Sequence, residues 1–267
     1  MAQNLNVKVT GSGEKRLVLL HGLFGSANNL GQLARAFKED YVVYSVDLPD
    51  HGKSPWLPEA SVQVYAQALA AWLAENEIGQ SRVIGHSLGG KVAMQLALDF
   101  PSLVERLVVL DIAPVAYCRR HDAVFGALNA VVEARAASRS EARAIMQPFL
   151  EDMRIVDFLL TSAHISNEGC VQWRFNLNGL SMGYESILGA ISARSGGAKK
   201  FSGPTLVVRG ELSDYITDES ARAFSQLFSS FDMVTVSGAG HWLHQEEPAA
   251  VSAATRQFFD TEIWVPN

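Results

Sequence analysis

Short runs of apolar and β-branched residues alternate along the chain with longer stretches whose apolar positions recur every three or four residues. The short runs lie at residues 16–20, 41–47, 81–85, 106–111, 205–209 and 232–236, with an edge strand expected at 6–10. Nearly continuous apolar runs are typical of parallel strands that are covered on both faces. Helical periodicity occurs at residues 28–37, 62–75, 88–99, 218–228 and 248–259. This alternation predicts an α/β fold with a mostly parallel, doubly wound sheet.

Residues 113–200 break this rhythm, since no strand pattern is evident there and the segment is too long for a bare loop. An apolar stripe around 123–132 and a capping box at Ser138 predict helices instead. We interpret the segment as a helical cap inserted into a core made of residues 1–112 and 201–267. Ordinary packing helices are the alternative, but the insertion follows the carboxyl end of a strand, where α/β sheets bind ligands.

Composition and charge narrow the class of protein. The 267 residues are 48% hydrophobic and 19% charged, with a formal net charge of -6. The chain is therefore expected to be globular, and without a basic run it is not expected to bind nucleic acid. Two cysteines, Cys118 and Cys170, give neither a disulfide framework nor a metal-binding spacing. No secretion signal or membrane-spanning run is evident, so we expect a cytoplasmic protein with no membrane contact.

The stretch VIGHSLGGKVAM, residues 83–94, contains the strongest chemical motif. It reads as a strand, then glycine-x-serine-x-glycine, then a helix. A sharp turn between strand and helix requires small residues on either side of the serine, and Gly85 and Gly89 supply them. We predict that Ser87 is a nucleophile and that the N–H of Leu88 points at a developing oxyanion. A chance glycine-serine turn is the alternative.

The remaining parts of a serine hydrolase site have candidates elsewhere. The loop HGLFG at 21–25 follows an early strand, and its Leu23 N–H is the expected second oxyanion donor. The base should be a late histidine, and His241 in SGAGHWLHQEEP lies in the loop after the last strand. We expect His86, next to the nucleophile, to serve packing, and Trp242 to line the acyl pocket.

Several of these segments together resemble the α/β-hydrolase family. They include HGLFGSANNL, DLPDHGKSP, GHSLGGKVAM, LDIAPVAYC and GAGHWLHQEEP. More closely, the chain is similar to small bacterial carboxylesterases that have mitochondrial relatives in animals. The resemblance implies catalytic roles for Ser87 and His241, and activity on short- to medium-chain esters or acyl thioesters.

The acidic partner of the histidine is open between two aspartates. Asp111 ends a buried strand, where a carboxylate is costly unless a partner such as a histidine compensates it. Asp214 lies in the loop after the next core strand, where most α/β-hydrolases place the acid, whereas the nearest resembling group uses the aspartate of DIAPV. We favour Asp111, with Asp214 as the alternative acid and Glu211 as a weaker third candidate.

The sequence thus predicts a serine carboxylic-ester hydrolase that acts on a small-molecule ester or thioester. We expect no cofactor and no metal, because the run DHGKS at 50–54 lacks the first glycine of a phosphate-binding loop. The alternatives are a C–C bond hydrolase or perhydrolase with the same triad, and a non-catalytic small-molecule sensor on the same scaffold. Acyl length, ester or thioester preference and oligomeric state cannot be read from the sequence.

Overall fold

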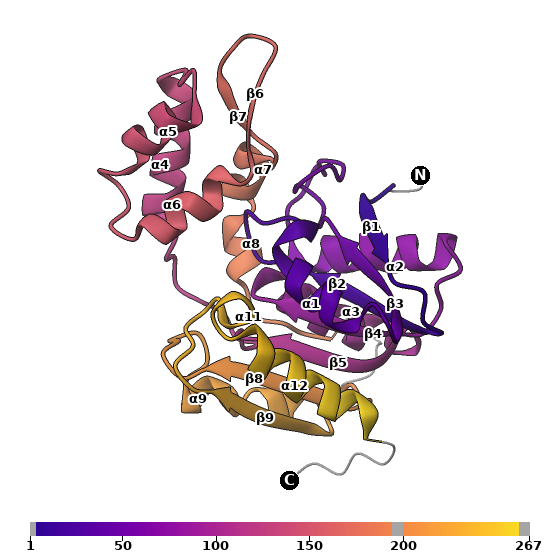
Figure 1. Ribbon diagram of the computed structural model, residues 1–267. Coiled ribbons are helices and arrows are strands. Elements are labelled where there is room, and N and C mark those ends of the chain that lie inside the picture. Colours follow the sequence, from indigo (N-terminus) through magenta and orange to yellow (C-terminus); the bar gives the residue numbers. More distant parts are fainter. Residues whose placement is uncertain (1–3, 194–199, 262–267) are drawn as a thin grey trace.

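The predicted strand runs assemble into one sheet in the computed structural model, which describes residues 4–193 and 200–261 (Figure 1). Its strands are β1 (Val7–Thr10), β2 (Lys15–Leu20), β3 (Tyr41–Val46), β4 (Ser81–His86), β5 (Val104–Leu110), β8 (Thr205–Gly210) and β9 (Phe231–Val236). Their order is β1-β3-β2-β4-β5-β8-β9, with β1 antiparallel to β3 and the other pairs parallel. The carboxyl ends of the parallel strands therefore share one edge, where the loops after β2, β4, β5, β8 and β9 converge.

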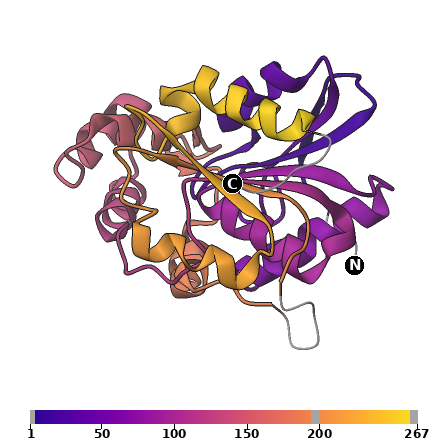
Figure 2. The ribbon, with the colours of Figure 1, turned by 90° about the horizontal axis from the view of Figure 1, so that it is seen from below.

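Helices cover both faces of this sheet (Figure 2). One face carries α1 (Gly31–Phe37) and α12 (Pro248–Asp260), and the other carries α2 (Val62–Glu75) and α3 (Leu88–Asp99). Along β2, Leu17 and Leu19 pack on the first face, whereas Val18 and Leu20 pack on the second. The alternation explains why residues 17–20 of this strand are all apolar, because each face has its own buried layer.

Two predicted helices are built differently in detail. Residues 28–37 form a 3-10 turn (Ala27–Leu30) followed by α1. Residues 218–228 form two short helices, α9 (Asp218–Ala221) and α10 (Phe224–Leu227), instead of one. A second 3-10 turn (Pro101–Leu103) precedes β5, and α11 (Leu243–Glu246) precedes α12.

The segment between β5 and β8 rises from the carboxyl edge of the sheet (Figure 1). It holds α4 (Asp122–Glu133), α5 (Arg139–Met146), α6 (Met153–Leu160), α7 (Leu177–Met182) and α8 (Tyr184–Leu188). The predicted capping box at Ser138 is only half formed. The Ser138 side chain accepts a 3.1 Å hydrogen bond from the N–H of Glu141, but the Glu141 carboxylate accepts from the N–H of Ala137 at 2.8 Å instead of from Ser138. We call residues 113–193 the insert, because residues 194–199 of the predicted cap lie outside the described residues.

The expectation that this segment has no strand is wrong. Strands β6 (Ala163–Ile165) and β7 (Val171–Trp173) form an antiparallel hairpin. Each strand has only three residues, which is too short for an alternating pattern to stand out in sequence. Within the described residues, no helix is long and apolar enough to cross a membrane.

Candidate active site

Ser87 occupies the turn between the last residue of β4 and the first residue of α3. Its backbone has φ 52° and ψ -118°, a strained conformation for a residue with a side chain. A Cβ on Gly85 would lie 2.2 Å from the carbonyl oxygen of Gly89, and one on Gly89 would lie 2.3 Å from that of Leu20. The turn therefore requires both glycines, and it holds the serine side chain at the carboxyl edge of the sheet, where it lines a cavity.

Asp111 and His241 are joined at the same edge of the sheet. The Nδ1–H of His241 donates a 2.7 Å hydrogen bond to Oδ2 of Asp111, whose side chain is fully buried. The carboxylate also accepts a 3.0 Å bond from the N–H of Gly210 and a short bond from the hydroxyl of Ser213. Three donors therefore hold this buried carboxyl group in place, so it can fix the tautomer of the histidine.

The other two acidic candidates point elsewhere. The side chain of Asp214 is 75% exposed and pairs with Arg120 at 2.6 Å. Glu211 accepts a 2.8 Å bond from the N–H of Gly238 and a 2.7 Å bond from the hydroxyl of Ser237. These bonds lower the pKa of Glu211, and they hold the loop that leads to the histidine. The carboxylate that contacts His241 is that of Asp111.

The loop after β2 lies beside the serine, since a Cβ on Gly22 would be 3.3 Å from Cβ of Ser87. In this loop, the N–H of Phe24 is engaged, because it donates a 3.1 Å bond to Nε2 of His51. Leu23, just before it, lines the cavity together with Ser87. Leu88 is the first residue of α3, and the first N–H of a helix has no acceptor within the helix. Both groups predicted as oxyanion donors thus lie beside Ser87.

Two buried histidines hold this loop in place. His21 donates through Nδ1–H to the carbonyl oxygen of Gly22 at 2.8 Å, and its Nε2 accepts from the N–H of Leu48 at 3.0 Å. His51 donates in the same way to the carbonyl oxygen of Pro49 at 2.8 Å. Burial lowers the pKa of His21 and lowers that of His51 to about 3, so both rings stay neutral and keep an acceptor nitrogen.

His86 does more than pack, which corrects the sequence prediction. Its Nε2–H donates a 2.8 Å hydrogen bond to the backbone oxygen of His241, and its ring lies 4.3 Å from that of His244. Burial lowers the pKa of His86 and lowers that of His244 to about 3. The neutral His86 thus positions the backbone of the catalytic candidate, and His244 packs against its ring. As expected, Trp242 lines the cavity, where its ring lies 5.6 Å from that of Phe158.

The imidazole of His241 is also held by a stack of planar groups. The Tyr215 ring lies parallel to it, with centroids 3.6 Å apart and planes 12° apart. The guanidinium of Arg120 lies 4.2 Å from the Tyr215 ring centroid. Tyr215 was not singled out in the sequence, although it directly follows the candidate Asp214 in the same loop.

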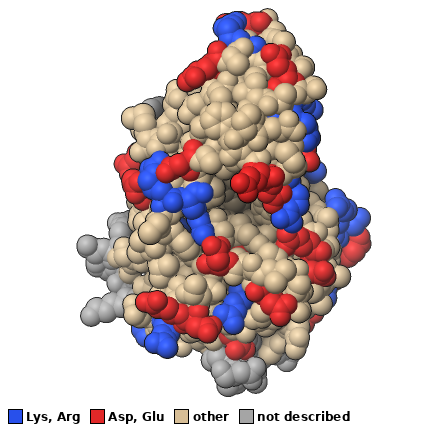
Figure 3. Space-filling view, turned by 90° about the vertical axis from the view of Figure 1, so that its left-hand side faces the viewer, with Lys and Arg blue, Asp and Glu red and all other residues tan. Residues whose placement is uncertain are grey.

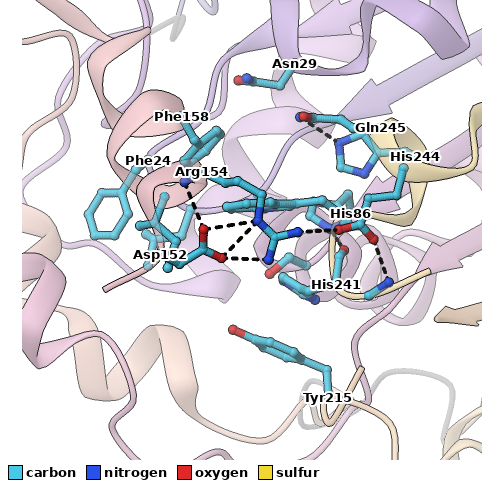
Figure 4. Close-up of a pocket in the computed structure, with 18 of the residues that line it drawn as sticks. Phe24, Asn29, His86, Asp152, Arg154, Phe158, Tyr215, His241, His244 and Gln245 are labelled. Carbon is cyan, nitrogen blue, oxygen red and sulfur yellow. Dashed lines mark hydrogen bonds and ion pairs between the residues drawn. The ribbon is translucent and has the colours of Figure 1, made fainter. Parts of the chain in front are cut away.

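A cavity of about 580 Å³ opens in front of Ser87 and His241 (Figure 4). It lies between the loop after β2, the loop after β9 and the insert. Its apolar walls come from the following residues: Leu23, Phe24, Val124, Ile155, Phe158, Leu159 and Trp242. Such a cavity fits a small molecule with an apolar portion. Among the described residues, no group of three or more metal-ligating side chains is present.

Charged side chains mark one rim of the cavity. Arg154 pairs with Asp152 at 2.7 Å and lies 3.7 Å from Glu246, and all three residues line the cavity. The close-up shows the guanidinium of Arg154 beside the carboxylate of Asp152 (Figure 4). On this side of the molecule, acidic and basic side chains surround a hollow (Figure 3). A polar rim over an apolar interior would orient an amphipathic substrate.

Comparison with known proteins identifies the relatives of this chain. A model of the alpha/beta hydrolase family matches residues 17–254. The chain is 38% identical over 245 residues to esterase YbfF of Escherichia coli, with 91% of this chain and 92% of that protein covered. It is 35% identical over 250 residues to the sn-1-specific diacylglycerol lipase ABHD11 of Mus musculus, with 91% and 80% covered.

Solved structures give the same assignment. A marine microorganism esterase superposes with a TM-score of 0.91 at 30% identity, covering 96% of this chain and 99% of that chain. E-2-(acetamidomethylene)succinate hydrolase superposes with a TM-score of 0.76 at 22% identity, covering 96% and 95%, which supports the fold alone. The chain belongs to the alpha/beta hydrolase family, as the family model and the relatives show, and its sheet order and strained turn at Ser87 agree with this.

Proposed function

We propose that this protein is a serine hydrolase of carboxylic esters, in which Ser87, His241 and Asp111 act as a catalytic triad. The observation that carries the proposal is the 2.7 Å hydrogen bond between His241 and the buried Asp111, in a site whose cavity is also lined by Ser87. The likeness to named esterases supports ester hydrolysis as the reaction class.

The reaction follows from these positions. Nε2 of His241 takes the proton of Ser87 as Oγ attacks the ester carbonyl, and the carbonyl oxygen becomes negative. The N–H groups of Leu23 and Leu88 donate hydrogen bonds to that oxygen. His241 then gives the proton to the leaving alcohol, and an acyl-enzyme remains. A water molecule, deprotonated by His241, attacks the acyl-enzyme, and the carboxylic acid leaves as Oγ regains its proton.

The lining of the cavity supports an ester with an apolar acyl chain as the substrate. Its apolar walls accommodate a short- to medium-length acyl chain, because burial of each methylene contributes about 0.8 kcal/mol. The insert helices α4 and α6 contribute Val124 and Phe158 to these walls, so they shield the reacting bond from water. An acyl thioester would react through the same steps, with a thiol as leaving group.

The test is a series of p-nitrophenyl esters from acetate to decanoate, hydrolysed by wild type and by Ser87→Ala. We expect turnover by wild type with an optimum at intermediate length, and a loss of at least about 10⁴-fold in kcat for the variant. Ser140→Ala, an exposed serine on α5, is the matched control and should retain the wild-type rate. An acyl thiocholine series compares thioesters at equal acyl length.

Equal rates for wild type and Ser87→Ala would overturn the proposal. Wild-type protein that binds p-nitrophenyl esters without releasing p-nitrophenol would indicate a sensor on the hydrolase scaffold. Turnover that is lost in Ser140→Ala as well as in Ser87→Ala would point to a general loss of fold, not to the nucleophile.

A further inference from the structure

Lys91 is a buried cation that the catalytic scheme above does not use. It lies on α3, one turn after the nucleophile, and its backbone N–H donates a 3.0 Å bond to the carbonyl oxygen of Ser87. Its side chain reaches four backbone carbonyl oxygens at the two ends of the insert. The distances from Nζ are 2.6 Å to Gly189, 2.8 Å to Leu188, 3.1 Å to Val115 and 3.4 Å to Ile187.

These carbonyls belong to the first and last parts of the insert, which we call its entry and exit connections. Val115 lies in the entry connection, between β5 and α4. Residues 187–189 lie at the end of α8, where the chain begins to return to the core. The last carbonyl oxygens of a helix find no N–H donor within the helix, so when they are buried another donor must bond to them. One ammonium group supplies this donor to both connections at once.

The two connections also contact each other beside Lys91. The N–H of Tyr117 donates to the carbonyl oxygen of Leu188, and that of Ile191 donates to the carbonyl oxygen of Pro114, both at 3.0 Å. The ring of Tyr117 lies 5.0 Å from Nζ of Lys91, within the range of a cation–π contact. The entry and exit therefore form a paired hinge, and the lysine ties that hinge to α3.

We propose that Lys91 is a positioning residue that fixes the hinge of the insert relative to the helix that begins at Ser87. In this role it sets the height of α4 and α6 over the cavity, and with it the fit of long acyl chains. The inference rests on the proposed esterase function for its kinetic readout but not for its structural one.

The charge of Lys91 suits this role. Burial lowers the pKa of Lys91 to about 7, and the protonated ammonium group donates to the converging carbonyl oxygens. Arg120 and His121 line the same wall of the site as Lys91, and burial lowers the pKa of His121 to about 4. The carbonyl oxygens of the hinge are thus the groups that hold the ammonium in place.

The experiment compares Lys91→Met with Lys91→Arg and with a matched control, Gln95→Met. Gln95 is buried one turn further along α3 and donates a 2.9 Å bond to the carbonyl oxygen of Ser192, at the end of the exit connection, so its variant controls for the loss of one buried hydrogen bond. Hydrogen exchange is followed at residues 113–121 and 184–192, and kcat and KM are measured with p-nitrophenyl acetate and p-nitrophenyl octanoate. A fluorophosphonate probe reports whether Ser87 still reacts.

For Lys91→Met we expect exchange to rise in both hinge segments, and KM for octanoate to rise about tenfold. The kcat for acetate should change less than about threefold, because the acetate does not fill the cavity. Lys91→Arg keeps a cation and donors, so its KM and exchange should be closer to wild type. Should Lys91→Met fail to fold, Lys91→Gln, which is shorter and keeps an amide donor, is measured with the same expected direction.

Unchanged exchange in the hinge of Lys91→Met or Lys91→Gln would overturn the inference, as would effects equal to those of Gln95→Met. A fall in acetate kcat as large as the effect on octanoate would assign Lys91 to general stability instead. If the esterase function itself is wrong, wild type shows no turnover of either ester, yet the exchange data still decide whether Lys91 fixes the hinge.

Discussion

Two loops at the same edge of the sheet each carry an aspartate, but only one of them meets the histidine. The loop after β5 carries Asp111, whose side chain is fully buried and bonded to His241 at 2.7 Å. The loop after β8 carries Asp214, whose side chain is 75% exposed and paired with Arg120. The same functional group is therefore a candidate catalytic acid in one loop and a surface ion-pair partner in the other.

The difference lies in what surrounds each carboxylate. The loop after β8 donates to Asp111 through the N–H of Gly210 and the hydroxyl of Ser213, so the second loop supports the acid of the first. Exposed ion pairs contribute about 0–1 kcal/mol because water and salt screen them. A buried, hydrogen-bonded carboxylate interacts far more strongly with an adjacent charge. The loop after β5 thus supplies the carboxylate that bonds to His241, and the loop after β8 supplies donors that hold this carboxylate in place.

Asp111→Asn should produce the largest loss of activity in this comparison. The amide has nearly the same shape but presents an N–H toward His241 or a neutral oxygen, so the tautomer and the developing imidazolium lose their support. We expect kcat for p-nitrophenyl butyrate to fall about 10⁴-fold, with the fold intact by circular dichroism. A loss below about tenfold would show that another group serves the histidine.

The contrast between buried and exposed titratable groups extends to stability in acid. The pKa of His51 is lowered from 6.5 to about 3, chiefly by burial, so below pH 6.5 the unfolded chain binds a proton that the folded chain does not. Stability therefore falls as pH falls through this window. His51 alone predicts a loss of about 2 kcal/mol between pH 7 and pH 5, measured by urea unfolding.

A free energy of unfolding that stays constant between these pH values would contradict the burial of neutral histidines around the loop at residues 21–25. The buried His244, whose pKa is lowered to about 3, acts in the same direction. The measured loss should therefore equal or exceed the value for one histidine.

Ser213→Ala sharpens the comparison, because it removes a hydrogen-bond donor that the loop after β8 gives to Asp111 and leaves the aspartate itself unchanged. The hydroxyl donates to Asp111, and a bond to a buried charge contributes about 1.5–3 kcal/mol. We expect kcat to fall about tenfold. Ser237→Ala is the matched control, since it removes a 2.7 Å bond to the carboxylate of Glu211. Equal effects of the two variants would argue against a special role for the loop after β8.

Asp214→Asn should have the smallest effect. It breaks an exposed ion pair with Arg120, whose guanidinium still lies against Tyr215. We expect kcat and KM within about twofold of wild type. A loss comparable to that of Asp111→Asn would reverse the assignment of the acid.

Local sequence patterns predicted most of the fold and two candidate residues of the site, the nucleophile Ser87 and the base His241. The apolar runs placed the sheet, because its central strands are buried on both faces, and the strained serine turn needs glycines that are visible in sequence. The sequence favoured Asp111 but kept Asp214 as an alternative, since both aspartates end or follow strands and only the path of the loop after β9 brings His241 to one of them.

The supporting residues were missed for a similar reason. His86 was expected to pack, yet it bonds to the backbone of His241, which is 155 positions away in the chain. His51 holds Phe24 across 27 positions. Such contacts between distant segments leave no spacing pattern for a sequence to reveal. The hairpin of β6 and β7 was missed because its strands are too short to show alternation.

The most direct test of the triad is the residual rate of p-nitrophenyl butyrate hydrolysis in combined variants. Ser87→Ala is compared with Ser87→Ala/Asp111→Asn and with Ser87→Ala/His241→Ala/Asp111→Asn. If the three residues act as one unit, the double and triple variants are no slower than Ser87→Ala alone, because the first substitution already removes the shared function. A further fall of about 10⁴-fold on adding Asp111→Asn would contradict a common mechanism, as would a Ser87→Ala variant that retains the wild-type rate.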